Sequence, residues 1–258
     1  MAAPRIGRLT VYPVKGLEGT DLEAAEVLPG GTLEFDRECA LFEDGEVLNG
    51  KQTARVHEVE ADFDPATRTL TAAVDGERAS FSLAEAADRE RAAEWFGEVF
   101  DRELTLKRDG DLGYVDRRGM GPSVVSTATL RELASWFEDL TVEGARHRLR
   151  ANVEVSGVEP FWEDRFVGDG APAFGADGVR FEGVTPCARC VVPSRDPDTG
   201  DPLPEFRQRF IEKRRETFPE WADDAAFDHF FTLMLIARVP EADRGETVAV
   251  GDRVRVVE

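Results

Sequence analysis

Short hydrophobic runs separated by Gly, Pro, Asp and Asn occupy most of the first hundred positions of the chain. The run Ile6–Val14 stops at a Tyr-Pro pair, and Ala24–Leu28 leads into Pro29-Gly30-Gly31, which is a strong turn signal. Further runs of the same kind follow at Glu38–Phe42, Val56–Ala61, Thr69–Val74 and Ala79–Leu83. Strands this short and this closely spaced predict a barrel or a sandwich.

Three segments change to the period of a helix: Ala84–Phe100, Thr129–Leu140 and Glu205–Phe218. The second opens with Thr129 and Glu132 in the capping-box spacing, which predicts that the helix starts there. Strands are predicted between and after the helices at Asn152–Ser156, Val179–Thr185, Arg189–Val192, Phe230–Val239, Thr247–Val250 and Arg253–Val257. Because strands dominate, the predicted fold class is mostly β or α+β.

The segment Asp109–Pro122 is rich in Gly and Asp and shows no hydrophobic period. Such a segment is either a boundary between two units or a mobile loop over a site. We predict the boundary here, with one unit over residues 1–105 and a second over residues 110–258. A chain of 258 residues is long enough to bury a substantial core without disulfides.

The charge balance narrows the classes of partner. The chain carries 52 acidic and 32 basic residues, a net charge of −20, and only four of the basic residues are lysines. A surface this negative disfavours non-specific binding to nucleic acid or to anionic membranes. Acid excess with few lysines also suits a cytoplasm of high salt, so the composition predicts halophilic adaptation.

No run approaches the ~20 apolar residues of a membrane span, and Met1–Thr10 holds no apolar core of a signal peptide. We therefore expect a cytoplasmic protein without membrane contact. Three cysteines, Cys39, Cys187 and Cys190, are too few for a disulfide framework or for a four-cysteine iron–sulfur cluster. Cys39 lies within an apolar run and is expected to be a core thiol.

The segment Cys187-Ala188-Arg189-Cys190 is the strongest candidate for chemistry. Arg189 and Arg195 make its surroundings positive, which favours the thiolate, the form of cysteine that attacks substrates and binds metals. The stretch Asp196-Pro197-Asp198-Thr199-Gly200 follows, and its Pro, Asp and Gly predict a rigid turn. A reactive thiol would therefore lie just ahead of a fixed loop.

Several interpretations of this cysteine pair stay open. A structural zinc needs four ligands, and His57, His147 and His229 show no ligand spacing. A thioredoxin-type redox pair needs a βαβ context, which the pattern does not show. Two buried inert thiols are a third alternative. The fourth, which we favour, is a single soft metal ligand in a cofactor site.

Polar residues in other segments fit an anionic ligand. Ser126 and Thr127 stand at the predicted start of a helix, where unpaired N–H groups and hydroxyls suit phosphate. Ordinary N-capping is the commoner explanation for such residues. A set of cations in strand-like segments either converges on one anion or consists of ordinary solvated charges; these are Lys15, Arg37, Arg148 and Arg150.

Five short motifs occur in the order seen in MOSC-domain proteins: Tyr12-Pro13-Val14-Lys15-Gly16, Phe35-Asp36-Arg37, Arg150-Ala151-Asn152-Val153, Pro186-Cys187-Ala188-Arg189-Cys190 and Asp196-Pro197-Asp198-Thr199-Gly200. Through them the chain resembles the C-terminal domain of molybdenum cofactor sulfurase and the mitochondrial amidoxime-reducing component. The resemblance covers nearly the whole chain. It implies an N-terminal β-barrel-like domain over residues 1–105, followed over residues 110–258 by a MOSC β-barrel domain with a few flanking helices.

The resemblance also implies a molybdenum cofactor of the molybdopterin type. Cys190 would ligate molybdenum through its thiolate and is the implied catalytic residue. The residues implied to hold the rest of the cofactor are Lys15, Arg37, Ser126, Thr127, Arg150, Asn152, Ala188 and Arg189. Pyridoxal phosphate binding is a further property associated with the family. A phosphorylated pterin is strongly anionic, so an acidic chain must concentrate its cations locally to bind one.

By the same resemblance, the expected reaction is reductive removal of oxygen from N-hydroxylated compounds at molybdenum, with a small N-oxygenated molecule as substrate. The chain has too few cysteines for a cluster of its own, so we expect a separate electron donor, a ferredoxin or a flavoprotein reductase. Two alternatives remain: a sulfur carrier with a persulfide on Cys187 or Cys190, and a non-catalytic cofactor-binding protein.

Overall fold

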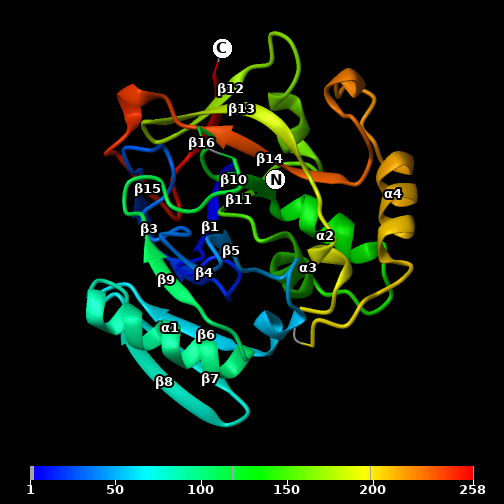
Figure 1. The fold of residues 1–258 in the computed structure, drawn as a ribbon. Coiled ribbons are helices and arrows are strands. Elements are labelled where there is room, and N and C mark those ends of the chain that lie inside the picture. Colours follow the sequence, from blue (N-terminus) through cyan, green and yellow to red (C-terminus); the bar gives the residue numbers. More distant parts are fainter. Residues whose placement is uncertain (1–2, 118, 198, 258) are drawn as a thin grey trace.

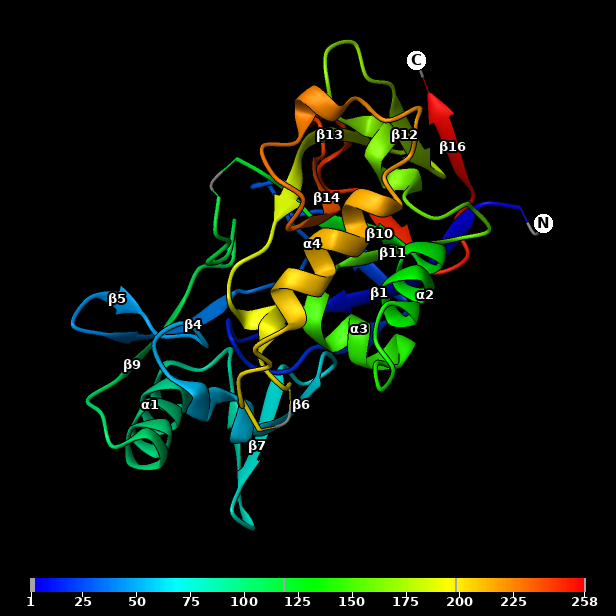
Figure 2. The same cartoon turned by 90° about the vertical axis from the view of Figure 1, so that its right-hand side faces the viewer.

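A computed structural model describes residues 3–117, 119–197 and 199–257 (Figure 1, Figure 2). Its largest element is an eight-stranded sheet. In order across this sheet, the strands are β16 (Val254–Val257), β12 (Ala173–Ala176), β13 (Val179–Ala188), β14 (Thr232–Arg238), β10 (Ser123–Ser126), β11 (Val153–Ser156), β1 (Arg5–Val11) and β2 (Thr20–Leu22). Strands β10 and β11 pair in parallel, and the other neighbours pair antiparallel.

Smaller sheets accompany the large one in the described part of the chain. One contains β5 (Glu46–Val47), β4 (Cys39–Glu43) and β9 (Thr105–Arg108). Another contains β6 (Glu60–Asp64), β7 (Thr69–Val74) and β8 (Glu77–Ser82). The third pairs β3 (Ala24–Glu26) with β15 (Thr247–Ala249).

The α-helices are α1 (Ala86–Phe100), α2 (Thr127–Ser135), α3 (Val142–Leu149) and α4 (Phe206–Glu216). Short 3₁₀ helices occur at Ala54–Glu58, Trp162–Phe166, Val192–Ser194, Asp224–Ala226 and Glu241–Asp243. Helix α1 lies beside the small sheet of β6, β7 and β8 at the bottom of Figure 1, whereas α2, α3 and α4 lie together beside the large sheet. The predicted fold class, mostly β with a few helices, is confirmed.

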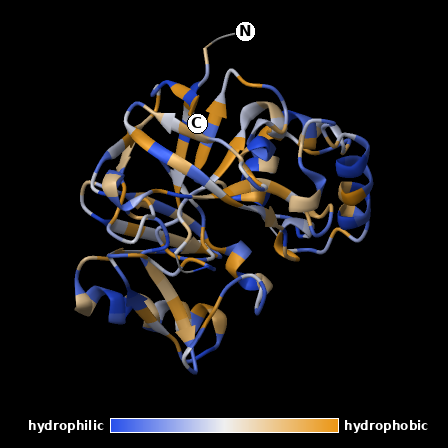
Figure 3. Cartoon of the chain, turned by 90° about the horizontal axis from the view of Figure 1, so that it is seen from above, coloured by the Kyte–Doolittle hydropathy of each residue, from blue (hydrophilic) through white to orange (hydrophobic). Residues whose placement is uncertain are grey.

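Helix α1 forms because apolar residues recur on one of its faces. Ala92, Phe96 and Phe100 are buried in one hydrophobic cluster with Phe81 of β8 and Leu106 of β9. On β1 Leu9 and Val11 are buried and Thr10 between them is less so, as expected for the two-residue period of a strand. Ile6 is also buried, because an irregularity between Ile6 and Arg8 shifts the register. Figure 3 shows the same contrast, with hydrophobic residues on the interior strands and a largely hydrophilic α4 at the right-hand edge.

The two halves of the chain share sheets. Strands β1 and β2 lie in the large sheet, where β1 pairs with β11, and β3 pairs with β15 near the C-terminus. The first strands of the predicted unit 1–105 are therefore hydrogen-bonded to strands of the predicted unit 110–258. The boundary itself stays a prediction.

Most of the predicted elements occur near their expected positions, and four differ. The predicted strand Val56–Ala61 is wrong over its first residues, because Ala54–Glu58 form a 3₁₀ helix and β6 begins only at Glu60. Helix α2 begins at Thr127, because the Ser126 hydroxyl caps it by accepting the Thr129 N–H at 2.9 Å. Helix α3 was not predicted; it is short, and the face that it buries includes the charged Arg148 beside Ala145 and Leu149. Residues 189–192 do not form the predicted strand, because β13 ends at Ala188 and a 3₁₀ turn follows.

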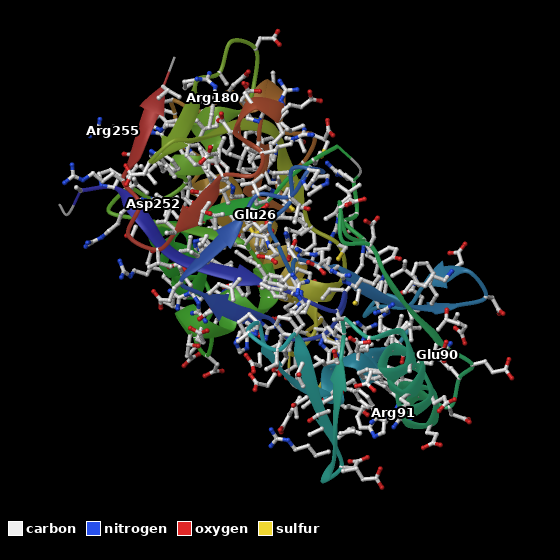
Figure 4. The ribbon with its side chains drawn as sticks, turned by 90° about the vertical axis from the view of Figure 1, so that its left-hand side faces the viewer. Glu26, Glu90, Arg91, Arg180, Asp252 and Arg255 are labelled. Atoms are coloured by element: carbon white, nitrogen blue, oxygen red, sulfur yellow. The ribbon has the colours of Figure 1, made fainter. Side chains whose placement is uncertain are left out.

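Charged side chains lie on the outside of the molecule, both around α1 and around the large sheet. Glu90 and Arg91 on α1 and Arg255 on β16 point away from the ribbon in Figure 4, and all three are exposed. Among the described residues, no helix combines the length and the apolar character that crossing a membrane requires.

One charge is completely buried. Arg214 of α4 is 0% exposed and forms an ion pair with the buried Asp164. Its guanidinium carbon also lies 4.4, 5.0 and 5.6 Å from the ring centres of Phe161, Phe218 and Phe227. The pair links α4 to the 3₁₀ turn at Trp162–Phe166, so it fastens this helix to the body of the molecule.

Replacing Arg214 with Met should lower the free energy of unfolding by about 3–5 kcal/mol, because Asp164 stays buried and loses its partner. The exposed pair Arg91–Asp88 provides the control, and Arg91→Met should cost less than about 1 kcal/mol. Denaturant unfolding measures both. Changing Asp164 to Leu in the Arg214→Met background should restore part of the loss. Equal losses in the two single variants would contradict this role for Arg214.

Candidate functional site

A cavity of about 720 Å³ is lined by segments from both halves of the chain. Its walls come from β1, from residues 12–19, 49–59, 115–117 and 120–121, from α3 and from residues 187–197. Most of the residues that the sequence assigned to a cofactor line it: Lys15, Arg37, Arg150, Asn152, Ala188, Arg189 and Cys190. The fold therefore brings together residues that lie far apart in the sequence.

The cavity is far more basic than the chain as a whole. Among the described residues, ten Lys and Arg and six Asp and Glu line it, although the chain has 32 basic and 52 acidic residues. The lining cations are Arg8, Lys15, Arg37, Lys51, Arg117, Arg146, Arg148, Arg150, Arg189 and Arg195. A local excess of positive charge inside an acidic protein attracts and holds anions.

The cations at the two ends of the cavity have different surroundings. Arg8 pairs with Asp21 and Glu143, and Arg146 pairs with Glu143 and Glu154, so carboxylates balance this end. The excess positive charge therefore lies at the other end, around Lys15, Arg37, Arg150 and the cysteine segment.

Main-chain pairing places Lys15 and Arg37 side by side. The N–H of Arg37 donates to the carbonyl of Tyr12 at 2.8 Å, and the N–H of Lys15 donates to the carbonyl of Cys39 at 2.8 Å. The chain just after β1 therefore runs beside the chain that enters β4. This pairing fixes both cations at the cavity without any side-chain contact between them.

Arg37 and Arg150 reach the cavity from unusual backbone positions. Both have positive φ, 55° and 56°, and Arg150 is the left-handed residue that ends α3. Their guanidinium carbons lie 4.9 and 4.0 Å from the centre of the buried Tyr12 ring. Burial, together with the nearby charge of Arg37, lowers the pKa of Arg150 to about 10. Arg150 is still a cation at neutral pH, and no ion pair with a carboxylate is seen for it among the described residues.

Partners within the chain hold each of these cations in place. Arg37 forms an ion pair with Asp36 at 2.5 Å, and Arg150 donates to the carbonyl of Leu17 at 2.5 Å. The ammonium of Lys15 donates to the carbonyl of Tyr114 at 2.7 Å and to Asp116 at 2.5 Å. Their orientations are therefore fixed before any ligand enters.

Asn152 lines the cavity but uses its amide for the fold. Its side-chain oxygen accepts from the N–H and the hydroxyl of Ser123 at 3.1 and 3.0 Å. Its side-chain nitrogen donates to the carbonyl of Thr10 at 3.2 Å. These bonds tie β10 and β1 to the start of β11, two residues after Arg150. The structure thus gives Asn152 a positioning role.

The cysteine segment turns away from the sheet at the cavity wall. Ala188 is the last residue of β13, and the N–H of Arg189 still donates to the carbonyl of Phe231 at 2.9 Å. The Arg189 guanidinium then packs against Cys187, 3.0 Å from its sulfur, and donates to the carbonyl of Leu149 at 3.0 Å. Cys190 follows the bend and is exposed, whereas Cys187 is half-buried and Cys39 is buried.

Burial raises the pKa of the Cys39 thiol to about 12, which agrees with the expected core thiol. The two cysteines of the motif are therefore the thiols that the structure leaves available for chemistry.

Arginines hold the loop that follows the cysteines. Arg148, only 8% exposed, donates to the carbonyls of Pro193 and Arg195. Arg195 in turn donates to the carbonyl of Gly200 at 3.0 Å, which closes the turn. Asp198, part of the predicted turn, lies outside the described residues. The loop is thus fastened to the end of α3, close to Arg150.

Ser126 and Thr127 do not line this cavity. Ser126 is 0% exposed, its hydroxyl caps α2, and its N–H donates to the carboxyl of Glu163 at 3.2 Å. Thr127 donates to Glu154 at 2.6 Å. The expected phosphate position at this helix start is thus occupied by the chain's own Glu163. Neither hydroxyl joins the group of cations.

The cavity includes residues that the sequence did not single out as functional. Asp116 and His57 line it, and burial lowers the pKa of His57, so its imidazole is neutral at pH 7. Nε of Arg189 and Nε of Arg195 are buried and have no hydrogen-bond partner among the described residues. No sequence signal marked Asp116 or the lowered pKa of His57, because neighbours from distant segments create their surroundings.

Comparison with known proteins gives two family matches. The model for the "MOSC N-terminal beta barrel domain" matches residues 3–141, and the model for the "MOSC domain" matches residues 118–255. Among solved structures, the chain is similar to the YuaD protein from Bacillus subtilis, with 13% sequence identity and a TM-score of 0.43. That match covers 99% of this chain and 96% of YuaD. A comparison with the curated proteins gives no match.

Glu163 should make stability depend on pH. Burial and the charge of Asp164 raise the pKa of Glu163 from 4.5 to about 8. The folded chain therefore keeps a proton that the unfolded chain has lost over this window, so the free energy of unfolding should fall as pH rises through it. Denaturant midpoints measured across the window test this. Glu163→Gln should flatten the slope, and an unchanged slope would contradict the assignment.

Proposed function

We propose that this chain, which belongs to the MOSC domain family, holds a molybdenum–pterin cofactor in the cavity and uses it to remove oxygen from N-hydroxylated compounds. The family is associated with molybdenum cofactor binding. One observation carries the proposal: an exposed thiol, Cys190, and the cations Lys15, Arg37 and Arg150 line the same cavity.

The residues present fit such a group. A phosphorylated pterin dithiolene is polyanionic, and the excess of cations around Arg37 and Arg150 matches that charge. The buried Nε–H groups of Arg189 and Arg195 have no acceptor in the part of the chain that the structure describes, and a ligand rich in oxygen and nitrogen can provide one. A cysteine thiolate is a soft ligand of the kind that binds metals. The cavity volume of about 720 Å³ is in the range of cofactor sites.

The assigned residues would divide the binding of the cofactor among them. Cys190, exposed beyond the end of β13, would bind the metal through its sulfur. Lys15, Arg37 and Arg150 would bind the phosphate and the polar edge of the pterin. Ala188 and Arg189 would form the adjoining wall, with Arg189 fixed by its contacts to Leu149 and Cys187. Asn152 would act through the strands that it ties together.

When bound, the cofactor would supply oxygen-atom transfer and two-electron redox chemistry. The overall reaction R₂N–OH + 2e⁻ + 2H⁺ → R₂NH + H₂O balances with electrons from outside the chain. With three cysteines the chain cannot build a four-cysteine cluster, so a ferredoxin or a flavoprotein reductase would be the donor. The chain's own residues would bind and orient the cofactor and hold one face of Cys190 open to substrate.

A second candidate function is sulfur transfer. The Arg189 guanidinium lies 3.0 Å from the sulfur of Cys187, and a cation in this position would stabilise the negative charge of a persulfide. On this alternative Cys187, rather than Cys190, would carry the transferred sulfur.

The cofactor content of purified protein tests the proposal. Protein made in a host that synthesises molybdopterin should contain close to one molybdenum per chain, and Cys190→Ala should lose most of it. Cys187→Ala is the matched control, since it removes a thiol of the same motif, and it should keep the metal. Metal analysis of the three proteins, together with hydroxylamine and amidoxime reduction by a chemical reductant, provides the readouts.

Each other outcome of this experiment selects another function. A cysteine adduct of about +32 Da without molybdenum would establish the sulfur carrier. Stoichiometric molybdenum without reduction of any N-hydroxylated compound would establish a non-catalytic binding protein. Equal metal content in Cys190→Ala and Cys187→Ala would exclude Cys190 as the ligand.

The charge of Arg150 should matter for retention of the cofactor. Arg150→Gln removes a half-buried cation of the cavity. We expect the cofactor to dissociate about tenfold faster or more, because charge-assisted hydrogen bonds contribute about 1.5–3 kcal/mol. Arg255→Gln removes an exposed cation on β16, outside the cavity, and should change nothing. The rate of molybdenum loss on dialysis measures both. Equal rates would contradict an anion-binding role for Arg150.

A further inference from the structure

A carboxylate from the chain itself occupies the cationic end of the cavity. Asp116 lies in the loop between β9 and β10, and its Oδ1 is 2.5 Å from the ammonium of Lys15. Its Oδ2 is 4.0 Å from the ammonium of Lys51. The charge of Arg37 also acts on this carboxylate. Three cations from separate segments therefore share one negative charge.

The loop is fixed just before Asp116 and open at Asp116 itself. The N–H of Tyr114 donates to the carbonyl of Arg37 at 2.8 Å, and its ring packs on Phe42 at 5.2 Å between centres. The side chain of Lys15 is only 14% exposed, whereas that of Asp116 is 68% exposed. Asp116 can therefore swing into solvent while Lys15 stays in place.

The carboxylate of Asp116 lies among these cations as the anion of a bound ligand would. A carboxylate carried by an anchored loop has a high effective concentration at the cations, so a free monoanion competes with it poorly. A dianion such as phosphate gains about twice the Coulomb attraction and can displace it. The groups facing Asp116 are the cations Lys15, Lys51 and Arg37, and Asp36, which is already paired with Arg37.

We infer that Asp116 is a built-in counterion that occupies the place of the ligand's phosphate and makes the cavity select doubly charged anions over singly charged ones. The inference rests on the proposed function in one respect: the phosphate belongs to the cofactor. Asp116 is thus a specificity-determining residue that leaves the cations when the cofactor enters. A singly charged salt anion is kept out of the site by the same contact.

Binding of inorganic phosphate and of acetate to the full chain, made in a host without molybdopterin, tests this inference. Calorimetry at about pH 8, where phosphate is a dianion and acetate a monoanion, should show that the wild-type chain binds phosphate and not acetate. Asp116→Ala should bind phosphate about tenfold more tightly, because one negative charge near the anion is gone. It should also gain acetate binding, since acetate can replace the missing side chain.

Asp111→Ala is the matched control, because Asp111 is an exposed acid of the same loop that does not line the cavity. It should behave as the wild-type chain does. Equal phosphate affinities in the two variants, acetate binding by the wild-type chain, or no gain of acetate binding in Asp116→Ala would each overturn the inference. These measurements use no molybdenum, so their failure is distinct from a failure of the metal analysis described above.

Discussion

Repulsion between half-buried cations is the constraint on which this site depends. The guanidinium groups of Arg37 and Arg150 both lie over the Tyr12 ring. Asp36 pairs with Arg37, whereas Arg150 donates to the carbonyl of Leu17. The lowered pKa of Arg150, about 10, reflects burial and the charge of its neighbour. A folded chain keeps such an arrangement at a cost in stability, and an anionic ligand offsets that cost when it binds. Elsewhere in the cavity, as at Arg8 and Arg146, acids of the chain already balance the charge.

The fold holds the cations against this repulsion with main-chain bonds. The pairing of residues 12–15 with residues 37–39 fixes Lys15 and Arg37, and the left-handed end of α3 fixes Arg150. Asn152 then joins the strands behind them. These contacts fix the backbone, and partners within the chain orient the side chains of Lys15, Arg37 and Arg150 before a ligand arrives. Preorganisation of this kind reduces the entropy that binding must spend.

The sequence predicted those parts of the structure that depend on residues close together in the chain. The short strands and the helices at α1 and α4 follow from hydrophobic periodicity, and the motif residues Lys15, Arg37, Arg150 and Cys190 were found through family resemblance. Contacts between residues that are distant in sequence could not be predicted in this way. The helix start at Ser126 has the residues that suit phosphate. In the structure, however, the Ser126 N–H donates to the carboxyl of Glu163, which is distant in sequence. Likewise Asp116 has no sequence signal, because its meaning comes from the cations that surround it.

The most direct measurement is anomalous diffraction at the molybdenum edge from crystals of the cofactor-loaded chain. The account predicts an anomalous peak within bonding distance of the Cys190 sulfur, with the phosphate of the pterin in contact with Lys15, Arg37 or Arg150 and with Asp116 turned away. A peak remote from Cys190, or a phosphate seated at the start of α2 beside Ser126, would contradict it.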